Sequence, residues 1–334
     1  MLNPLTCVVV NAAIIGVLWL GMGKVNDGVL LRGDLVAMIN YMGQILIELV
    51  KLANLVVLLG KAMASLGRVE QILDTESSMD FSGTVIDATG NVAVEFQNVS
   101  LQYQGAGDAS IENISFTLQE GQTLGIIGGT GSGKSTLVNL IPRFYDATSG
   151  EVRLMGTPIR ELTEGALRKT VAIVQQKAQL FAGTIRSNLL WGNKNASEED
   201  LWKALETAQA AEFVREKGLD AVVEQGGRNL SGGQKQRLTI ARALVANPKI
   251  LILDDSSSAL DYATDAALRR AIKNLPGDMT VIIVSQRTAS IQHADHILVL
   301  EDGCLAGQGT HGQLLETCPI YREIYESQFR KEEA

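Results

Sequence analysis

A glycine-rich stretch, GGTGSGKST from Gly128 to Thr136, has the residue types and spacing of a phosphate-binding loop. It fits the pattern G-x-x-x-x-G-K-[ST], in which glycines let backbone N–H groups turn toward phosphate oxygens. Lys134 would bridge the terminal phosphates of a nucleotide, and Ser135 would ligate Mg²⁺. A glycine-rich turn that binds no nucleotide is the alternative. The residues predicted to bind the nucleotide in this stretch are Gly128, Gly129, Thr130, Gly131, Ser132, Gly133, Lys134, Ser135 and Thr136.

Two adjacent carboxylates, Asp254 and Asp255, end the apolar run ILIL. A carboxylate at the end of a buried strand that faces a phosphate loop is the usual Mg²⁺ partner in P-loop nucleotide hydrolases. We therefore predict that Asp254 contributes to a metal site together with Ser135. A buried acid with only a structural hydrogen bond is the alternative. This pattern does not assign a role to Asp255.

The elements that must position these residues form an α/β pattern from Val92 onward. Residues 92–103 alternate like a strand, and TLGIIG (123–128), directly before the glycines, is typical of a buried strand. Helical stretches separate the later apolar runs, and the apolar stretch LVNLI (137–141) follows the glycines as a helix. The order of strand, glycine-rich turn and helix is the context that a phosphate loop requires.

Two apolar segments precede this region. Residues 5–21 carry no charge, and residues 35–60 carry only Glu48 and Lys51. As helices they would be about 26 and 39 Å long, against a hydrocarbon core of about 30 Å, so we predict two transmembrane helices. A cleaved signal peptide is the alternative for the first segment, which has no basic region before it.

The parts of the chain can then be delimited. Residues 61–74 keep a helical period while becoming charged, as expected for a helix that leaves a membrane, and a polar stretch rich in turn formers follows. We predict a partial transmembrane domain over 1–66, a cytosolic helix extension and linker over 67–90, and a nucleotide-binding domain over 91–334.

Polar residues gather on one side of the second apolar segment, within an arc of about 120° at ~100° per residue. Such a face either lines a water-filled pathway or makes contacts with other helices, and both interpretations stay open. Glu48 and Lys51 have the spacing of an ion pair. The face consists of Asn40, Gln44, Glu48, Lys51 and Asn54.

The charge of the chain argues against general nucleic-acid binding, and its cysteines do not indicate a metal site. Residues 1–66 hold four basic and three acidic residues, and because the whole chain has a net charge of −8, the remainder carries −9. So acidic a region is a poor general nucleic-acid binder, since neutralising phosphates requires clustered Lys and Arg. Cys304 and Cys318 lack metal-ligand spacing and are interpreted as reduced thiols.

A second glycine-bearing motif, NLSGGQKQR from Asn229 to Arg237, resembles the signature sequence of ABC-transporter ATPases. The resemblance implies an α/β P-loop ABC-type ATPase domain, with a RecA-like core, an antiparallel β subdomain and a helical subdomain, preceded by two transmembrane helices. In this family, ATP with Mg²⁺ is held between the phosphate loop of one domain and the signature of another in a head-to-tail dimer. The resemblance therefore implies that Ser231, Gly232, Gly233 and Gln234 contact the nucleotide of a partner.

The resemblance extends over 91–334. Tyr103 matches the aromatic residue that stacks on adenine, although alone it would be an ordinary strand tyrosine. Gln176 matches the glutamine that contacts Mg²⁺ and the attacking water; an exposed loop glutamine is the alternative. Glu224 matches a residue that faces coupling helices of the membrane domain in exporters, and SALD (258–261) matches a loop that crosses the dimer interface.

The apolar segments resemble the last two of the six helices of an exporter half-transporter, so we expect the chain to be a fragment that lacks the first four. The resemblance places the protein in a membrane, that of a bacterial cell, with its nucleotide-binding domain in the cytoplasm. It implies a second half-transporter subunit as partner and no nucleic acid. The transported substrate is not indicated.

Two residues depart from the family pattern. Asp255 stands where active members have a glutamate that polarises the attacking water, and Gln286 stands where they have a switch histidine. Losing a general base typically costs about 10²–10⁴ in rate, and ~1 Å of misplacement about 10²-fold. We therefore expect the site of this chain's own phosphate loop, with Asp255, Gln286 and Gln176 as its catalytic set, to bind MgATP and hydrolyse it slowly.

Several functions agree with these features. The favoured hypothesis is the degenerate subunit of a heterodimeric ATP-driven exporter, whose intact signature serves a competent partner. An active homodimeric exporter that tolerates Asp255 and Gln286 is the alternative. A soluble ABC protein agrees poorly with the apolar segments. A purely regulatory nucleotide-binding module differs from the first hypothesis only in whether transport depends on ATP held here.

Overall fold

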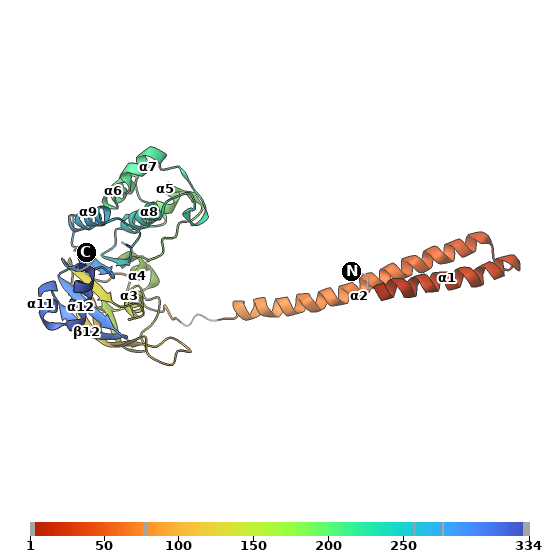
Figure 1. The fold of residues 1–334 in the computed structure, drawn as a ribbon, viewed down its shortest axis with the longest axis horizontal. Helices are drawn as coiled ribbons and strands as arrows, with labels where there is room; N and C mark the ends of the chain where they lie inside the picture. The colour runs from red at the N-terminus through yellow and green to blue at the C-terminus, as the bar shows by residue number, and fades with distance from the viewer. Residues whose placement is uncertain (1–3, 76–78, 257, 276, 330–334) are drawn as a thin grey trace. The chain divides into compact units, whose positions relative to one another are not determined.

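The computed structural model of the chain describes residues 4–75, 79–256, 258–275 and 277–329, and divides into two compact units, 1–78 and 79–334. The first unit is a pair of helices, α1 (Pro4–Asn26) and α2 (Arg32–Leu73), which lie side by side and are joined by a short turn (Figure 1). Gly21 permits close approach of α1 to α2, because a Cβ atom at this position would lie 2.2 Å from Leu35 Cδ1.

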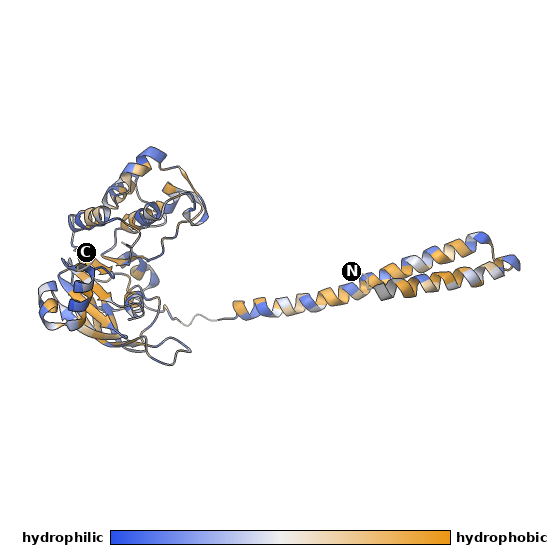
Figure 2. Cartoon of the chain, in the orientation of Figure 1, coloured by the Kyte–Doolittle hydropathy of each residue, from blue (hydrophilic) through white to orange (hydrophobic). Residues whose placement is uncertain are grey.

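Both helices of the first unit are apolar over most of their length (Figure 2). By length and composition, Val8–Asn26 and Arg32–Leu73 could each cross a membrane. Large apolar side chains such as Trp19 and Val56 are exposed on them. On the polar side of α2, Lys51 donates a 2.6 Å hydrogen bond to Glu48, as the spacing predicted. In water such apolar surface would be costly, so the helices need a lipid or protein environment.

The second unit is built on two sheets. The core sheet has the strand order β12-β11-β3-β10-β9-β6, and only its edge pair, β11 with β12, is antiparallel. The antiparallel sheet has the order β2-β1-β4-β5. The strands are β1 (Val92–Leu101), β2 (Ile111–Gln119), β3 (Thr123–Gly128), β4 (Ser149–Leu154), β5 (Thr157–Pro158), β6 (Val171–Val174), β9 (Ile250–Asp254), β10 (Thr280–Val284), β11 (His296–Glu301) and β12 (Cys304–Gly309).

Helices cover the core sheet and form a separate helical subdomain. This subdomain consists of α5 (Ile185–Leu190), α6 (Glu198–Thr207), α7 (Ala211–Lys217) and α8 (Gly232–Val245), with the short pair β7 (Gly183–Thr184) and β8 (Val222–Val223) and the 3₁₀ turn Gln225–Gly227. The remaining helices are α3 (Lys134–Leu140), α4 (Glu164–Thr170), α9 (Tyr262–Lys273), α10 (Thr288–Ile291), α11 (His311–Thr317) and α12 (Pro319–Phe329).

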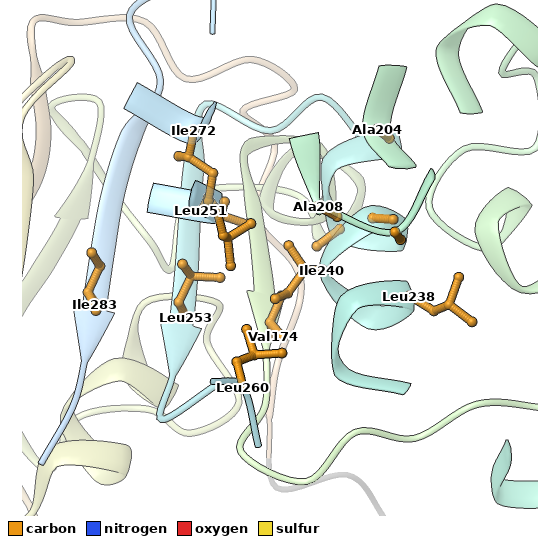
Figure 3. Close-up of a cluster of buried hydrophobic side chains, with 14 of the residues drawn as sticks. Val174, Ala204, Ala208, Leu238, Ile240, Leu251, Leu253, Leu260, Ile272 and Ile283 are labelled. Atoms are coloured by element: carbon orange, nitrogen blue, oxygen red, sulfur yellow. The ribbon is translucent and has the colours of Figure 1, made fainter. Parts of the chain in front are cut away.

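The core sheet separates two hydrophobic clusters. Because side chains alternate along a strand, Ile250 and Ile252 of β9 pack with α3 and the antiparallel sheet, whereas Leu251 and Leu253 face the opposite cluster. Figure 3 shows the second cluster, in which Leu251 and Leu253 lie near Ile240 of α8. Strands covered on both faces read as continuous apolar runs, which explains the sequence ILIL.

Residues 79–90 pack against the rest of the second unit. The buried Arg143 donates a 2.7 Å hydrogen bond to the Asp80 carbonyl and forms an ion pair with Asp146 at 2.8 Å. Lys249 Nζ donates to the Ala88 carbonyl at 2.9 Å, and Val85 forms a β-bridge with Leu162. This polar stretch is therefore held against the α/β unit by side chains far away in the sequence.

Candidate functional site

The glycine-rich stretch connects the carboxyl end of β3 to the start of α3. Gly131 and Gly133 have positive φ angles of 84° and 90°, which glycine adopts without steric cost. At Gly133, a Cβ atom would lie 2.7 Å from Ile111 Cγ2 and 2.8 Å from the Ser110 carbonyl oxygen. Both conformation and close packing therefore require glycine at this position.

Lys134 lies largely buried within the loop. Its ammonium donates to the carbonyls of Gly128, at 3.0 Å, and Gly129, and to Ser132 Oγ at 3.3 Å. Burial lowers the pKa of Lys134, and the negative charges of Asp255 and Asp254 oppose that shift. An anion bound here would give the ammonium a partner of opposite charge in place of neutral carbonyls.

Ser135 and Asp254 form the pair that would hold Mg²⁺. Asp254 ends β9 and is 7% exposed, and Ser135 Oγ donates to Asp254 Oδ1 at 3.3 Å. Desolvation by burial raises the pKa of Asp254 although the Ser135 hydroxyl favours the charged form. Oxygen ligands suit Mg²⁺, whose remaining positions are commonly filled by phosphates and water. Among the described residues no group of three or more His, Cys, Asp or Glu could hold a metal ion. A Mg²⁺ ion at Ser135 and Asp254 would therefore need further oxygen ligands, such as phosphates or the Gln176 amide.

Asp255 and Gln176 meet beside this pair. Gln176, in the loop after β6, donates from Nε2 to Asp255 Oδ2 at 2.9 Å. Asp255 has a φ of 44°, in the left-handed region, and its N–H donates to the Val284 carbonyl at 2.9 Å. Ser258 N–H and Oγ donate to the Asp255 carbonyl at 3.2 and 2.9 Å. The backbone of Asp255 is thus anchored, while its carboxylate contacts the Gln176 amide.

Gln286 lies at the same edge of the core sheet. Strand β10 runs parallel to β9 with Val284 opposite Asp254, and Gln286 follows two residues later with an exposed side chain. The three histidines lie elsewhere: His293 follows α10, His296 starts β11, and His311 Nδ1 is 2.7 Å from the Tyr321 hydroxyl. None occupies position 286.

Tyr103 borders the glycine-rich loop. Its hydroxyl donates to Thr136 Oγ1 at 3.2 Å, and its ring meets Tyr145 edge to face with centroids 5.0 Å apart. The ring is half-buried, which leaves part of it accessible for stacking. Its role toward adenine stays a prediction.

The signature motif begins helix α8, with Ser231 as the N-cap residue. Ser231 Oγ accepts from the Gln234 N–H at 3.3 Å, and Gln234 Oε1 accepts from the Ser231 N–H at 3.1 Å, so the two residues form a capping box. Figure 1 shows α8 in the helical subdomain and α3 beside the sheets. The two glycine-bearing helix starts therefore belong to different subdomains.

Sequence reasoning missed two neighbours of these residues. Tyr145 was not singled out as a partner of Tyr103, and Gln328 of α12 donates to the Gln286 carbonyl at 2.7 Å. Spacing offers no signal for Gln328, because it lies 42 residues after Gln286.

Together, the fold and site define a class of protein. A phosphate loop between a parallel strand and a helix, an aspartate on a nearby strand, an antiparallel sheet and a helical subdomain beginning at SGGQ form an ABC-type ATPase domain. This is the predicted fold class.

The comparisons with known proteins agree with this class. Residues 111–258 match the ABC transporter family. The chain is 40% identical over 331 residues to the uncharacterized ABC transporter ATP-binding protein YfiB of Bacillus subtilis, covering 98% of this chain and 57% of that protein. It is 36% identical over 330 residues to a Pasteurella multocida protein described as an ATP-dependent lipid A-core flippase, with 98% and 56% covered.

A solved structure gives the same result for the fold. The structure of a bacterial Atm1-family ABC exporter with ATP bound matches with a TM-score of 0.75 and 31% identity, over 98% of this chain and 58% of that one. Residues 111–258 therefore carry the ATP-binding domain of the ABC transporter family, and nearly the whole chain is similar to ABC transporter proteins. It spans somewhat more than half the length of the relatives it matches.

Proposed function

We propose that this chain is the ATP-binding and C-terminal transmembrane part of an ABC exporter subunit, in which MgATP binding at a head-to-tail dimer interface drives export. The contacts of Lys134 in the glycine-rich loop and the Ser135–Asp254 pair support the binding of phosphates and Mg²⁺ at this site. The apolar helices α1 and α2 support membrane insertion, and we propose that the α/β unit lies in the cytoplasm.

We further propose that the site built on this chain's own phosphate loop is weakly hydrolytic and that the signature serves a competent partner subunit. The observation that carries this proposal is the Asp255–Gln176 contact at 2.9 Å. The carboxylate at the position of the catalytic base contacts the amide of the residue proposed to ligate Mg²⁺. Gln286, in turn, offers only a neutral hydrogen bond to a γ-phosphate, since an amide does not accept a proton as imidazole does. The intact capping box at Ser231 is consistent with a signature kept for another chain.

A homodimeric exporter is the second candidate. The anchored backbone of Asp255 favours it, because a carboxylate whose main chain is held by Val284 and Ser258 keeps a defined position from which to orient water. In that case Asp255 would polarise the attacking water, as the glutamate of active family members does.

The test measures ATP binding and phosphate release in detergent at high protein concentration. It compares the full unmodified chain with the double variant Asp255→Glu/Gln286→His. We expect the unmodified chain to bind MgATP and turn over slowly, and the double variant to gain about 10²-fold or more in rate. Asp278→Glu, the same exchange at an exposed loop residue, is the matched control and should change nothing.

Asp255→Ala separates the two candidates. A degenerate site should lose little of its already slow turnover on this change. Brisk turnover by the unmodified chain that Asp255→Ala abolishes would instead assign the base to Asp255 and favour the homodimer.

A further inference from the structure

One side chain of α12, that of Gln328, makes three hydrogen bonds to the segment after β10. Its Oε1 accepts from the Thr288 N–H at 2.9 Å and from Thr288 Oγ1 at 3.0 Å. Its Nε2 donates to the Gln286 carbonyl at 2.7 Å. A single amide group thus contacts the residues on both sides of Arg287.

The first contact replaces a missing helix cap. Thr288 is the first residue of α10, whose N-cap residue, Arg287, makes no side-chain capping hydrogen bond. The first N–H groups of a helix have no partner within it, and leaving one buried and unpaired costs about 1–3 kcal/mol. Thr288 is fully buried, so its N–H cannot turn to water instead. Gln328 supplies from another helix what an N-cap residue usually supplies locally.

The second contact holds the backbone of Gln286 itself. Gln286 follows the end of β10, next to Asp254, where its side chain would face a γ-phosphate. On the other side of the segment, Ser285 Oγ accepts from the Arg287 N–H at 2.9 Å, and the Arg287 guanidinium lies 5.0 Å from the Tyr262 ring centroid. The peptide group between Gln286 and Arg287 is therefore held at both ends, its N–H by Ser285 Oγ and its carbonyl by Gln328 Nε2.

The helix that carries Gln328 is itself anchored. Tyr321 of α12 is fully buried, and its hydroxyl lies 2.7 Å from His311 Nδ1 of α11. A hydrogen bond from a side chain on a packed helix fixes its partner more firmly than one from a free loop, because less side-chain freedom remains to be lost.

We propose that Gln328 is a positioning residue that sets the backbone of Gln286, and through it the hydrogen bond that position 286 makes to the γ-phosphate. This rests on the proposed function of the site. It makes α12, through its last turn, part of the machinery that decides how fast the bound nucleotide is hydrolysed.

The test uses two substitutions that separate capping from positioning. Gln328→Ala removes all three hydrogen bonds. Gln328→Glu keeps the acceptor for Thr288 but loses the donor to Gln286 and sets a carboxylate oxygen against its carbonyl. Ser327→Ala, one residue earlier in α12, removes only a hydroxyl bond to the Ile324 carbonyl and is the control. All are made in the full chain carrying Asp255→Glu/Gln286→His, where turnover is expected to be fast enough to resolve kcat from KM.

We expect Gln328→Ala and Gln328→Glu both to lower kcat about fivefold, the loss of one hydrogen bond of ordinary strength, with KM for ATP changed less than twofold. Ser327→Ala should match its parent. If Gln328→Glu retained the parental kcat, Gln328 would be only a cap for α10 and the proposal would be wrong. A loss confined to KM would also contradict it.

Amide hydrogen exchange in the otherwise unmodified chain gives a readout that does not depend on catalysis. In Gln328→Glu, Thr288 should stay protected while Arg287 exchanges faster, because the cap remains and the Gln286 contact is lost. In Gln328→Ala both should exchange faster. If the repaired parent hydrolyses no ATP, the proposed function fails, whereas this pattern of exchange still decides whether Gln328 holds the segment.

Discussion

The phosphate-loop half and the signature half of this domain satisfy their polar groups in different ways. In the phosphate-loop half, Lys134 and Asp254 are buried, their pKa values are shifted by burial, and they contact other groups that would bind the same ligand. In the signature half, Ser231 and Gln234 satisfy each other in a capping box at an accessible helix start. In the proposed function, the first half would hold a ligand within the domain, whereas the second would present an already stable helix start to a partner.

The two residues expected to depart from the family pattern fall in one of these halves. Asp255 and Gln286 lie in the phosphate-loop half, and the signature SGGQ is unchanged. Because the signature would act on a nucleotide held by another domain, its retention is consistent with a partner that depends on it. We therefore expect that the two halves can be altered separately, and substitutions in each half test whether they are independent.

The largest effect should come from Lys134→Ala. This change removes the only side-chain ammonium of the glycine-rich loop and leaves the phosphates without its charge-assisted contacts. We expect the affinity for MgATP to fall on the order of 100-fold, as the loss of hydrogen bonds to charged groups implies. Titration with a fluorescent ATP analogue measures it. Lys169→Ala, at an exposed lysine of α4, is the control; an equal loss there would show that general charge rather than the loop binds the nucleotide.

A smaller effect is expected from Ser231→Ala in the chain repaired by Asp255→Glu/Gln286→His. If each signature acts on the site of the opposite chain, turnover should fall roughly tenfold while MgATP affinity stays within twofold. Ser197→Ala is a matched control, because Ser197 caps α6 in the same way, by accepting from the Asp200 N–H at 3.2 Å. Each change should cost about 1 kcal/mol in unfolding free energy. A loss of nucleotide affinity in Ser231→Ala would mean that the two halves act on one site within the chain.

The smallest effect should come from Tyr103→Phe. The ring that would stack on adenine remains, and only the hydroxyl bond to Thr136 at 3.2 Å is lost. We expect the dissociation constant for MgATP to change less than about threefold, because a net hydrogen bond is worth about 1 kcal/mol or less here. Tyr103→Ala should weaken binding further, by the ~1–3 kcal/mol typical of stacking a base on an aromatic ring. Equal losses in both variants, measured by calorimetry, would assign the contribution to the hydroxyl instead.

Local residue patterns were enough to predict much of the domain. The strand TLGIIG, the glycine-rich loop and the helix after it are found in that order as β3, the loop and α3, because each depends on neighbours within a few residues. The run ILIL is a strand covered on both faces. The extension of the second apolar helix into residues 61–73 followed from its unbroken period.

Contacts between residues far apart in the sequence could not be predicted, because the patterns used for prediction depend only on neighbouring residues. The bond from Gln176 to Asp255 joins residues 79 positions apart, and Gln328 meets Gln286 only after α11 and α12 have packed. The polar residues after α2 suggested a linker by composition, yet Arg143 and Lys249 hold Asp80 and Ala88 against the domain. Side chains from distant segments decide these contacts, and no local period or spacing records them.

The amino-acid sequence by itself therefore determined the chemistry this chain can offer: a phosphate loop, a buried carboxylate beside it, a signature and two residues that depart from the family pattern. Those features are local, since they depend on residue types at short spacing. Only the tertiary structure decided how they are held. Parallel pairing of β9 with β10 brings Asp254 and Gln286 to one edge of the core sheet, and the packing of α12 places Gln328 against the Gln286 backbone. Such contacts arise from burying the two faces of a sheet and its covering helices at once, which is a property of the whole domain.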